Sequence, residues 1–309
     1  MPAYSYARSL DNSFKASWKL EEVLERTRFD RSLRWMPPAL SGSAEAACLD
    51  EQGRRALTQV ELASYAHLFG YVEAFIAPKV NVLAADFALC DLPAFEALSN
   101  FTAEEVKHMN LFRAVRERVD AALGFELELV GGAEETARFV LGKNTGAVLL
   151  LITAIEWMTQ RHYLDCIRDD ARLDPATRAL FKAHWQEESQ HAQLDHLETL
   201  RAFVGMQPAE RERAVDDLIE LVLAVDGLLL RQSELDLANL ERCLARSFAP
   251  AEREQLFGAL LKAKRWTFLL SGVTHPRFQE LFAEVTTPAQ RARVAKALEA
   301  LERMPVLDC

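Results

Sequence analysis

The chain has 309 residues; half are hydrophobic and 27% are charged, a balance typical of globular proteins that excludes a disordered chain. Its net charge of -10 argues against a nucleic-acid-binding surface, which needs an excess of Lys and Arg. The five Cys residues are scattered and show no CxxC spacing, so we expect free thiols in a reducing compartment.

The first fifteen residues contain no apolar run of the kind found in signal peptides. No segment reaches the roughly 18 apolar residues that we would require of a membrane-spanning helix. We therefore expect a cytoplasmic protein with no membrane partner and no nucleic-acid partner.

Residues 1–55 are the least regular part of the chain, and the Pro-rich and Gly-containing segment 35–43 predicts a loop. Thr58 and Glu61 have the spacing of a capping box and predict the start of a first long helix. That helix is expected to end near Cys90.

Three further long helices follow in the sequence. The second is predicted from Asp91 to Gly124, and the third from Glu134 to Asp170. Asp174 followed by Pro175 predicts the start of a fourth, which ends at Gly205. Later helix starts are predicted at Pro208, Pro250 and Pro288.

The residues 125–130 alternate between apolar and polar side chains, but they lie between two long helices and have no partner strand. We therefore predict an all-α fold. The expected organisation is a single helical domain, 1–309, with a four-helix core at 56–205 and additional helices at 206–309.

Two of the predicted helices each contain a lone carboxylate in an apolar setting. Glu73 is the only acidic or basic residue, apart from a histidine, among the seventeen residues between Glu61 and Lys79. Glu156 is likewise the only acidic or basic residue among the seventeen residues between Lys143 and Arg161. A buried carboxylate costs several kcal/mol unless it is paired, protonated or bound to a metal.

The other two helices each contain Glu-x-x-His, which places a carboxylate and an imidazole on one helical face. The first motif is Glu105 with His108, and the second is Glu188 with His191. The two motifs are 83 residues apart, and so are the lone carboxylates Glu73 and Glu156. The chain therefore repeats a two-helix unit in register over residues that can bind metal.

Antiparallel pairing places these residues at the same level. With a turn near residue 90, Glu73 and Glu105 lie at similar distances from the turn; Glu156 and Glu188 do the same around residue 172. Glu61 would miss that level by roughly 18 Å at 1.5 Å per residue, so we exclude it as a ligand.

Two lone Glu residues and two Glu-x-x-His motifs facing a bundle interior form the ligand set of ferritin-like dinuclear metal proteins. Four carboxylates offset the charge of two divalent ions, and oxygen ligands with imidazoles suit iron or manganese. His184 lies on the same face as Glu188 and His191, while its counterpart in the first unit is Phe101. His184 is therefore a candidate seventh ligand, although it could also be an ordinary buried histidine.

The motif order resembles that of the para-aminobenzoate N-oxygenase (AurF-like) family of non-haem di-iron oxygenases. That family also has Glu, Glu-x-x-His, Glu and His-x-x-x-Glu-x-x-His in this order. The resemblance covers about residues 58–205. The positions that match the family's metal ligands, which are also the predicted catalytic residues, are Glu73, Glu105, His108, Glu156, His184, Glu188 and His191.

The resemblance implies an enzyme that uses two Fe ions to activate O2 and oxygenates the nitrogen of a small arylamine. Manganese or a mixed Mn/Fe pair is also compatible with the ligands. Electrons would come from a separate reductase, and the family resemblance implies a homodimer. The alternatives are a di-iron hydroxylase or desaturase acting on carbon, an iron oxidase or storage protein, and a manganese catalase.

Residues next to these positions are weaker candidates. Carboxylates that could orient the histidines are Glu104, Glu187 and Asp195. Aromatic residues that could wall a pocket are Tyr71, Phe75, Trp157 and Trp185. Histidines expected to lie off the metal face or level are His67, His162 and His196.

Overall fold

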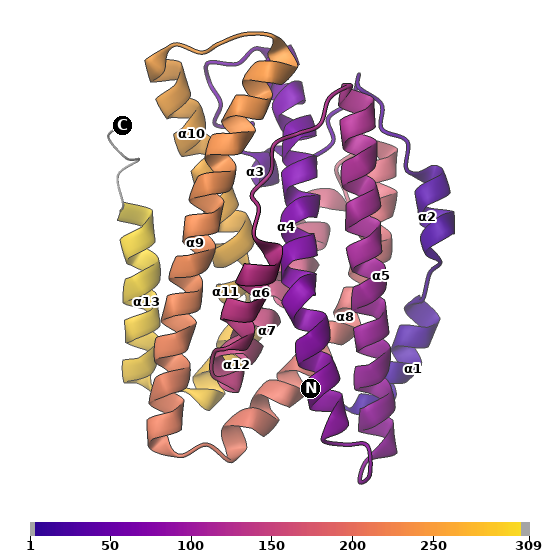
Figure 1. The fold of residues 1–309 in the computed structure, drawn as a ribbon, viewed down its shortest axis with the longest axis vertical. Helices are drawn as coiled ribbons and strands as arrows, with labels where there is room; N and C mark the ends of the chain where they lie inside the picture. Colours follow the sequence, from indigo (N-terminus) through magenta and orange to yellow (C-terminus); the bar gives the residue numbers. More distant parts are fainter. Residues whose placement is uncertain (1–3, 304–309) are drawn as a thin grey trace.

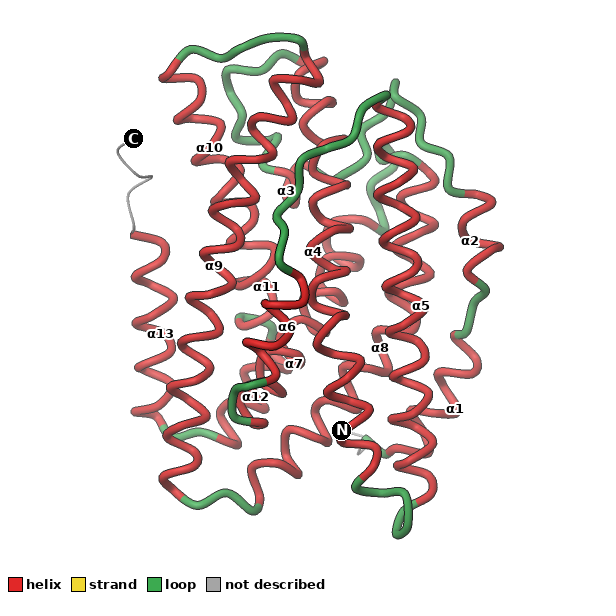
Figure 2. Tube along the Cα trace, viewed as in Figure 1, coloured by secondary structure: helices red, strands yellow, loops and turns green. Residues whose placement is uncertain are grey.

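The computed structural model describes residues 4–303, which form helices joined by loops (Figure 1 and Figure 2). The described part contains one isolated β-bridge, between Arg34 and Leu173, and no strand. Residues 125–130 form a loop, as their lack of a partner predicted. The all-α prediction is therefore confirmed.

Four long helices form a bundle: α4 (Glu51–Ala85), α5 (Leu92–Leu123), α7 (Thr145–Arg161) and α8 (Pro175–Val204). Helix α4 packs against α5, α7 packs against α8, and α5 packs against α8. Side chains on the inward face of each helix contribute to one apolar core.

The predicted start of α4 is wrong by eight residues, because the capping residue is Asp50 instead of Thr58. The helix begins at Glu51, because the Asp50 side chain accepts a hydrogen bond from the backbone N–H of Gly53 at 2.7 Å. Thr58 is buried inside the helix, and its hydroxyl oxygen accepts a bond from the backbone N–H of Trp35 at 3.1 Å. Pro78 also lies inside α4.

The prediction of a single third helix over 134–170 is also wrong, because a short loop after residue 141 interrupts it. Helix α6 (Ala133–Leu141) ends at Gly142, and the Asn144 side chain then caps the start of α7. After α7 the chain continues as a π-helix, η1 (His162–Ile167).

Other predicted boundaries are confirmed. Asp91 and Asp174 cap the starts of α5 and α8, and Gly205 follows α8. Gly124 ends α5 with a φ of 83°, a left-handed conformation that glycine adopts without strain.

The N-terminal segment is more regular than predicted. It contains α1 (Tyr6–Ala16), α2 (Leu20–Arg26) and α3 (Pro38–Ser41). Helix α1 packs on α5 and α8, so it covers the outside of the four-helix core (Figure 1). The fully buried positions of α1 are Ser9 and Ser13, which explains why apolar periodicity did not reveal it.

The additional helices lie on the other side of α4 from α1 and α2 (Figure 1). They are α9 (Pro208–Leu244), α10 (Pro250–Arg265), the π-helix η2 (Trp266–Leu270), α11 (Ser271–Val273), α12 (Pro276–Val285) and α13 (Pro288–Arg303). The starts predicted at Pro208, Pro250 and Pro288 are confirmed, whereas α12 was not predicted. Helix α9 packs against α4 and α7, and α13 packs against α9.

Helix α4 is long and apolar enough, by length and composition, to pass the test for a membrane span that we expected no segment to pass. Its most apolar window is 56% buried inside the protein, as expected for the core helix of a bundle. We read α4 as a core helix.

Candidate di-metal site

The bundle core brings the seven candidate ligands together, and every one is buried. They come from all four helices of the bundle and are Glu73, Glu105, His108, Glu156, His184, Glu188 and His191. That they bind metal stays a prediction.

Six of the seven form two overlapping groups. In the first, one ligand atom from each of Glu73, His108, His184 and Glu188 lies within 4.8 Å of the others. The second group, with the same spacing, joins His108 and Glu188 to a further pair, Glu105 and His191. Because His108 and Glu188 belong to both groups, the arrangement is the one expected of two neighbouring metal positions.

Glu156 belongs to neither group, but it lies beside them on α7. Burial, together with the charge of Glu188, raises the pKa of Glu156 well above its ordinary value. Its carboxylate is thus close enough to act on Glu188.

Carboxylate and imidazole atoms approach each other closely at the centre of the site. His108 Nδ1 lies 2.9 Å from Glu188 Oε1 and 3.8 Å from Glu105 Oε1. His191 Nδ1 lies 2.7 Å from Glu105 Oε1. Both histidines of the Glu-x-x-His motifs therefore direct Nδ1 inward.

His184 distinguishes one side of the site from the other. Its Nε2 lies 2.7 Å from Glu188 Oε1 and 3.7 Å from Glu73 Oε1. Its counterpart in the first unit, Phe101, instead stacks on the His191 ring with centroids 3.9 Å apart. The first group therefore has an additional imidazole, whereas the second is covered by a phenyl ring.

The outward nitrogens of His108 and His191 are held by carboxylates from the opposite helix. His108 Nε2 donates to Glu187 Oε2 on α8 at 2.9 Å, and His191 Nε2 donates to Glu104 Oε2 on α5 at the same distance. In a neutral imidazole, a hydrogen bond at the outer nitrogen fixes the tautomer and leaves the lone pair of Nδ1 directed into the site, where it can bind a metal. Glu104 and Glu187 thus orient the histidines, as their positions suggested.

Each orienting carboxylate has a further partner, and the two partners differ. The Ser13 hydroxyl of α1 donates to Glu104 at 2.9 Å. The Lys107 ammonium instead pairs with Glu187 and lies 4.3 Å above the Trp18 ring. Ser13 and Trp18 belong to the segment predicted to be irregular, and no sequence pattern marked them.

Burial and mutual repulsion dominate the electrostatics of the carboxylates. Burial, reinforced by the neighbouring Glu105, raises the pKa of Glu73 well above its ordinary value. Burial also raises the pKa of Asp195 well above its ordinary value, and Asp195 lies one turn beyond His191. Without cations, such a cluster holds extra protons.

The histidines respond to the same charges. Burial lowers the pKa of His108, but the carboxylates of Glu188 and Glu187 outweigh it and raise the value to about 9. Burial likewise opposes protonation of His184 and lowers its pKa. Despite burial, His184 and His191 lower the pKa of Glu188 well below its ordinary value.

The polar atoms at the centre fit a metal better than they fit one another. Among the described residues, several of these buried atoms have no hydrogen bond of acceptable geometry: Glu73 Oε2, both oxygens of Glu105, His108 Nδ1, Glu156 Oε2 and His184 Nε2. Buried polar groups are nearly always hydrogen-bonded in proteins. Unpartnered oxygen and nitrogen atoms that converge on one region fit the arrangement of metal ligands. The donor set suits iron or manganese.

The residues excluded from the site lie elsewhere, as predicted. Glu61 pairs with Lys264. His67 Nε2 lies 2.7 Å from the carbonyl oxygen of Val130, and the His196 ring packs against Tyr4. His162 belongs to neither group and lies between the hydroxyl groups of Tyr65 and Ser271.

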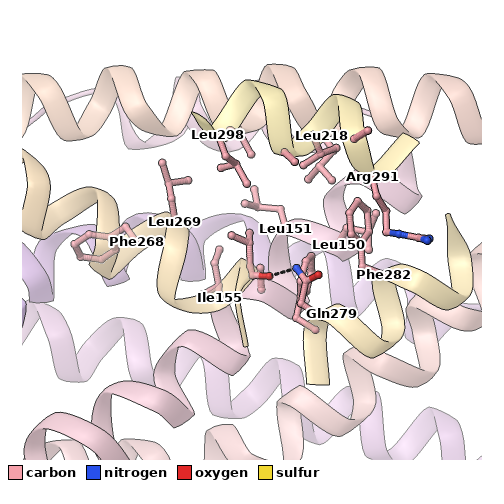
Figure 3. A pocket seen from close by; sticks show the side chains of 17 residues that line it. Leu150, Leu151, Ile155, Leu218, Phe268, Leu269, Gln279, Phe282, Arg291 and Leu298 are labelled. Atoms are coloured by element: carbon pink, nitrogen blue, oxygen red, sulfur yellow. Dashed lines mark hydrogen bonds between the residues drawn. The ribbon is translucent and has the colours of Figure 1, made fainter. Parts of the chain in front are cut away.

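Two apolar cavities adjoin the ligand-bearing helices. A small one, about 60 Å³, is lined by Tyr71, Val72 and Phe75 of α4. A larger one, about 310 Å³, lies between α7 and the C-terminal helices. Figure 3 shows its apolar lining, which includes Ile155, the neighbour of Glu156. Trp157 and Trp185 line neither cavity.

The fold and the buried cluster define a helical-bundle protein with a di-metal centre. Residues 5–240 match the model of the family described as P-aminobenzoate N-oxygenase AurF. The chain belongs to this family and is an oxidoreductase. A search of curated proteins found no match.

Solved structures of R2-like ligand-binding oxidases are similar at low identity. A variant with an aerobically reconstituted Mn/Fe cofactor shares 14% identity, with a TM-score of 0.36, over 82% of this chain and 93% of its own. A second variant, with an anaerobically reconstituted Mn/Fe cofactor, shares 14% identity over 82% and 92% of the two chains, with a TM-score of 0.37.

Proposed function

We propose that the protein is a non-haem di-iron oxygenase that uses O2 to oxygenate the nitrogen of a small arylamine. The observation that carries the proposal is the convergence of four buried Glu and three buried His side chains from α4, α5, α7 and α8. Membership of a family described by an arylamine N-oxygenase supports the choice of substrate. The cytoplasmic location, the homodimer and the separate reductase remain predictions.

Four of the proposed ligands are carboxylates, whose negative charges would offset the charge of two divalent ions: Glu73, Glu105, Glu156 and Glu188. Nitrogen ligands would be His108, His184 and His191. Bound iron would supply the reduction of dioxygen that oxygenation requires.

The protein's own contribution is orientation and exclusion of water. Glu104 and Glu187 hold the inner histidines in one tautomer through their outer nitrogens. Phe101 covers the ring of His191, and Phe112 meets the ring of His184 edge-on with centroids 4.8 Å apart. These rings keep solvent from the inner nitrogens.

The cavity beside α7 is large enough for the proposed substrate. A cavity of about 150 Å³ holds benzene, and this one measures about 310 Å³. Its lining is apolar apart from Gln279 and Arg291, and Figure 3 shows the Arg291 guanidinium directed away from the apolar side chains. An uncharged aromatic ring fits such a lining, and Leu151 and Ile155 also line the smaller cavity.

The test is anaerobic loading with ferrous iron, followed by O2 and a panel of arylamines, alkylamines and unsaturated hydrocarbons. We expect two irons per chain and hydroxylamine or nitro products from arylamines, detected by mass spectrometry. Glu73→Gln should lose iron and products, whereas Glu61→Gln, which alters a buried carboxylate on the same helix, should retain both. Products oxidised only at carbon, or iron uptake without any organic product, would contradict the proposal.

A further inference from the structure

A buried phenol and imidazole form a hydrogen-bonded pair outside the metal cluster. Tyr65 lies on α4, two turns before Glu73, and its hydroxyl oxygen is 2.8 Å from His162 Nδ1. Both side chains are buried. His162 Nε2 lies 3.0 Å from the hydroxyl oxygen of Ser271.

The hydrogen bonds of Ser271 assign the tautomer of His162. The single hydroxyl hydrogen of Ser271 is donated to the carbonyl oxygen of Thr267 at 2.8 Å. Its oxygen must therefore accept the hydrogen of His162 Nε2. His162 Nδ1 is then unprotonated, and the Tyr65 hydroxyl donates its hydrogen to it.

Both groups are electrically neutral in the folded protein. Burial lowers the pKa of His162 to about 3, with Arg161 acting in the same direction. Burial, with smaller contributions from Cys166 and Glu188, raises the pKa of Tyr65 well above its ordinary value. Burial raises the pKa of the Cys166 thiol to about 11, so it too is uncharged.

Aromatic rings connect this pair to the metal site in one direction. The Tyr65 ring stacks on Phe69 with centroids 4.6 Å apart. Phe69 meets the ring of His184, a proposed iron ligand, at 5.5 Å. Two short ring-to-ring steps therefore separate the phenol from the ligand set.

Other rings connect the pair to the surface in the opposite direction. Trp266 stacks on His162 with centroids 5.7 Å apart and is partly exposed. The guanidinium of Arg161 lies 5.9 Å from the centroid of the Trp266 ring. Tyr65 and Trp266, both oxidisable side chains, thus flank one imidazole.

The backbone marks the same two positions independently. His162 is the first residue of η1, and Trp266 is the first residue of η2. The π-helix is rare and is frequently found at functional sites. Here the two π-helical segments of the described chain bring His162 and Trp266 together.

We propose that Tyr65, His162 and Trp266 form a redox relay that carries single electrons from the protein surface to the metal centre. This inference rests on the proposed function, because the oxidant is the O2-oxidised iron centre. Tyr65 gives up one electron, and its phenolic proton moves to His162 Nδ1, which leaves a neutral tyrosyl radical and an imidazolium. A one-electron reductase then returns an electron through Trp266, and the proton returns to the phenolic oxygen.

The first test is freeze-quench electron paramagnetic resonance of ferrous-loaded protein mixed with O2, with ring-deuterated tyrosine to identify the signal. We expect a tyrosyl radical in the wild type and none in Tyr65→Phe. His162→Gln can accept from Tyr65 and donate to Ser271 but cannot carry a proton, so it should also lose the signal. Tyr71→Phe is the matched control, because the Tyr71 hydroxyl donates to the carbonyl oxygen of Val130, which accepts no proton.

Iron content and O2 uptake, measured on the same samples, separate the two proposals. Absence of both would contradict the di-iron function. Normal iron binding and O2 uptake without a tyrosyl radical, or a radical that survives Tyr65→Phe, would overturn the relay alone.

A second measurement tests the outer half of the relay without iron. A photogenerated one-electron oxidant in solution should produce the tyrosyl radical in metal-free wild type but not in Trp266→Phe. Circular dichroism checks that each variant folds. Equal radical yields in wild type and Trp266→Phe would contradict the proposed route to the surface.

Discussion

His184 lies between Glu73 and Glu188 and has no histidine counterpart in the first two-helix unit. As a ligand it would give one iron an additional nitrogen donor. We predict that His184→Ala keeps most of the iron, because all four carboxylates that offset the charge of two divalent ions remain, but changes the rate of reaction with O2. Iron analysis and stopped-flow absorbance measure the two properties. If the variant reacted like the wild type and only its thermal stability fell, His184 would be an ordinary core residue.

The orienting carboxylates allow a paired prediction. Removing a group that orients a metal-bound histidine typically lowers metal affinity roughly 10- to 100-fold. We expect Glu187→Gln and Glu104→Gln each to weaken iron binding within that range while the fold is retained. Competition with a chelator measures the affinity. Unchanged affinity in both variants would show that these hydrogen bonds contribute only to packing.

Glu61 provides a prediction about pH. Burial raises its pKa to about 8, although the Lys264 ammonium opposes this. The folded protein therefore holds a proton that the unfolded chain releases above the ordinary value of 4.5. The stability contributed by this proton is complete below 4.5 and is lost as pH rises through about 8.

We therefore expect the free energy of unfolding of metal-free wild type to fall relative to Glu61→Gln as pH rises from 4.5 to about 8. The difference between the two proteins isolates Glu61 from the titrating groups of the metal site. Urea unfolding at several pH values measures it. Parallel pH profiles for the two proteins would contradict the prediction.

At the scale of elements, α1 connects the N-terminal segment to the site through one hydroxyl. A hydrogen bond to a charged group contributes about 1.5–3 kcal/mol, so Ser13→Ala should lower the free energy of unfolding by about that amount. It should also weaken iron binding, because Glu104 loses a partner.

Ser9 is the matched control on the same helix. Its hydroxyl oxygen is buried and has no hydrogen-bond partner in the described part of the chain. Ser9→Ala should therefore leave stability unchanged or raise it slightly. Equal losses in Ser9→Ala and Ser13→Ala, measured by denaturant unfolding, would mean that α1 contributes only packing.

Helix ends were predictable where a short polar side chain precedes Pro or where Gly follows, as at Asp174 and Gly205. The start of α4 was misplaced because Asp50 competes with Thr58 as a cap, and local sequence does not rank the two. Helix α1 was missed because its buried face carries serines instead of apolar residues.

The clustering of the candidate site residues was largely predictable, because repeated spacing on helices determines both the helical face and the level along the bundle. Its outer partners depend on contacts between segments distant in sequence, such as Ser13 with Glu104. No helical period encodes such contacts. The hydrogen-bonded pair of Tyr65 and His162 is of the same kind, since the two residues are 97 positions apart.

At the scale of the whole molecule, metal binding and folding are coupled. A ligand that binds only the folded state stabilises it by about 2.7 kcal/mol at a concentration 100 times its dissociation constant. We therefore expect ferrous iron to raise the melting temperature by several degrees under anaerobic conditions, measured by calorimetry. The rise should shrink in Glu73→Gln and Glu156→Gln, which each remove one proposed ligand. A melting temperature that does not respond to iron would contradict a preformed site.

The reciprocal bonds of Glu104 with His191 and of Glu187 with His108 have a consequence for symmetry. Each residue of one bond lies 83 positions from its counterpart in the other, so the two bonds are related by a pseudo-twofold axis through the site. Neither half completes its own histidine environment, just as neither subunit of an isologous dimer completes a shared interface. The two halves differ at two pairs of positions that are equivalent in the 83-residue repeat. Lys107 corresponds to Gln190, and Phe101 corresponds to His184. The internal symmetry thus confines the chemical difference between the two proposed metal positions to a few side chains in an otherwise equivalent arrangement.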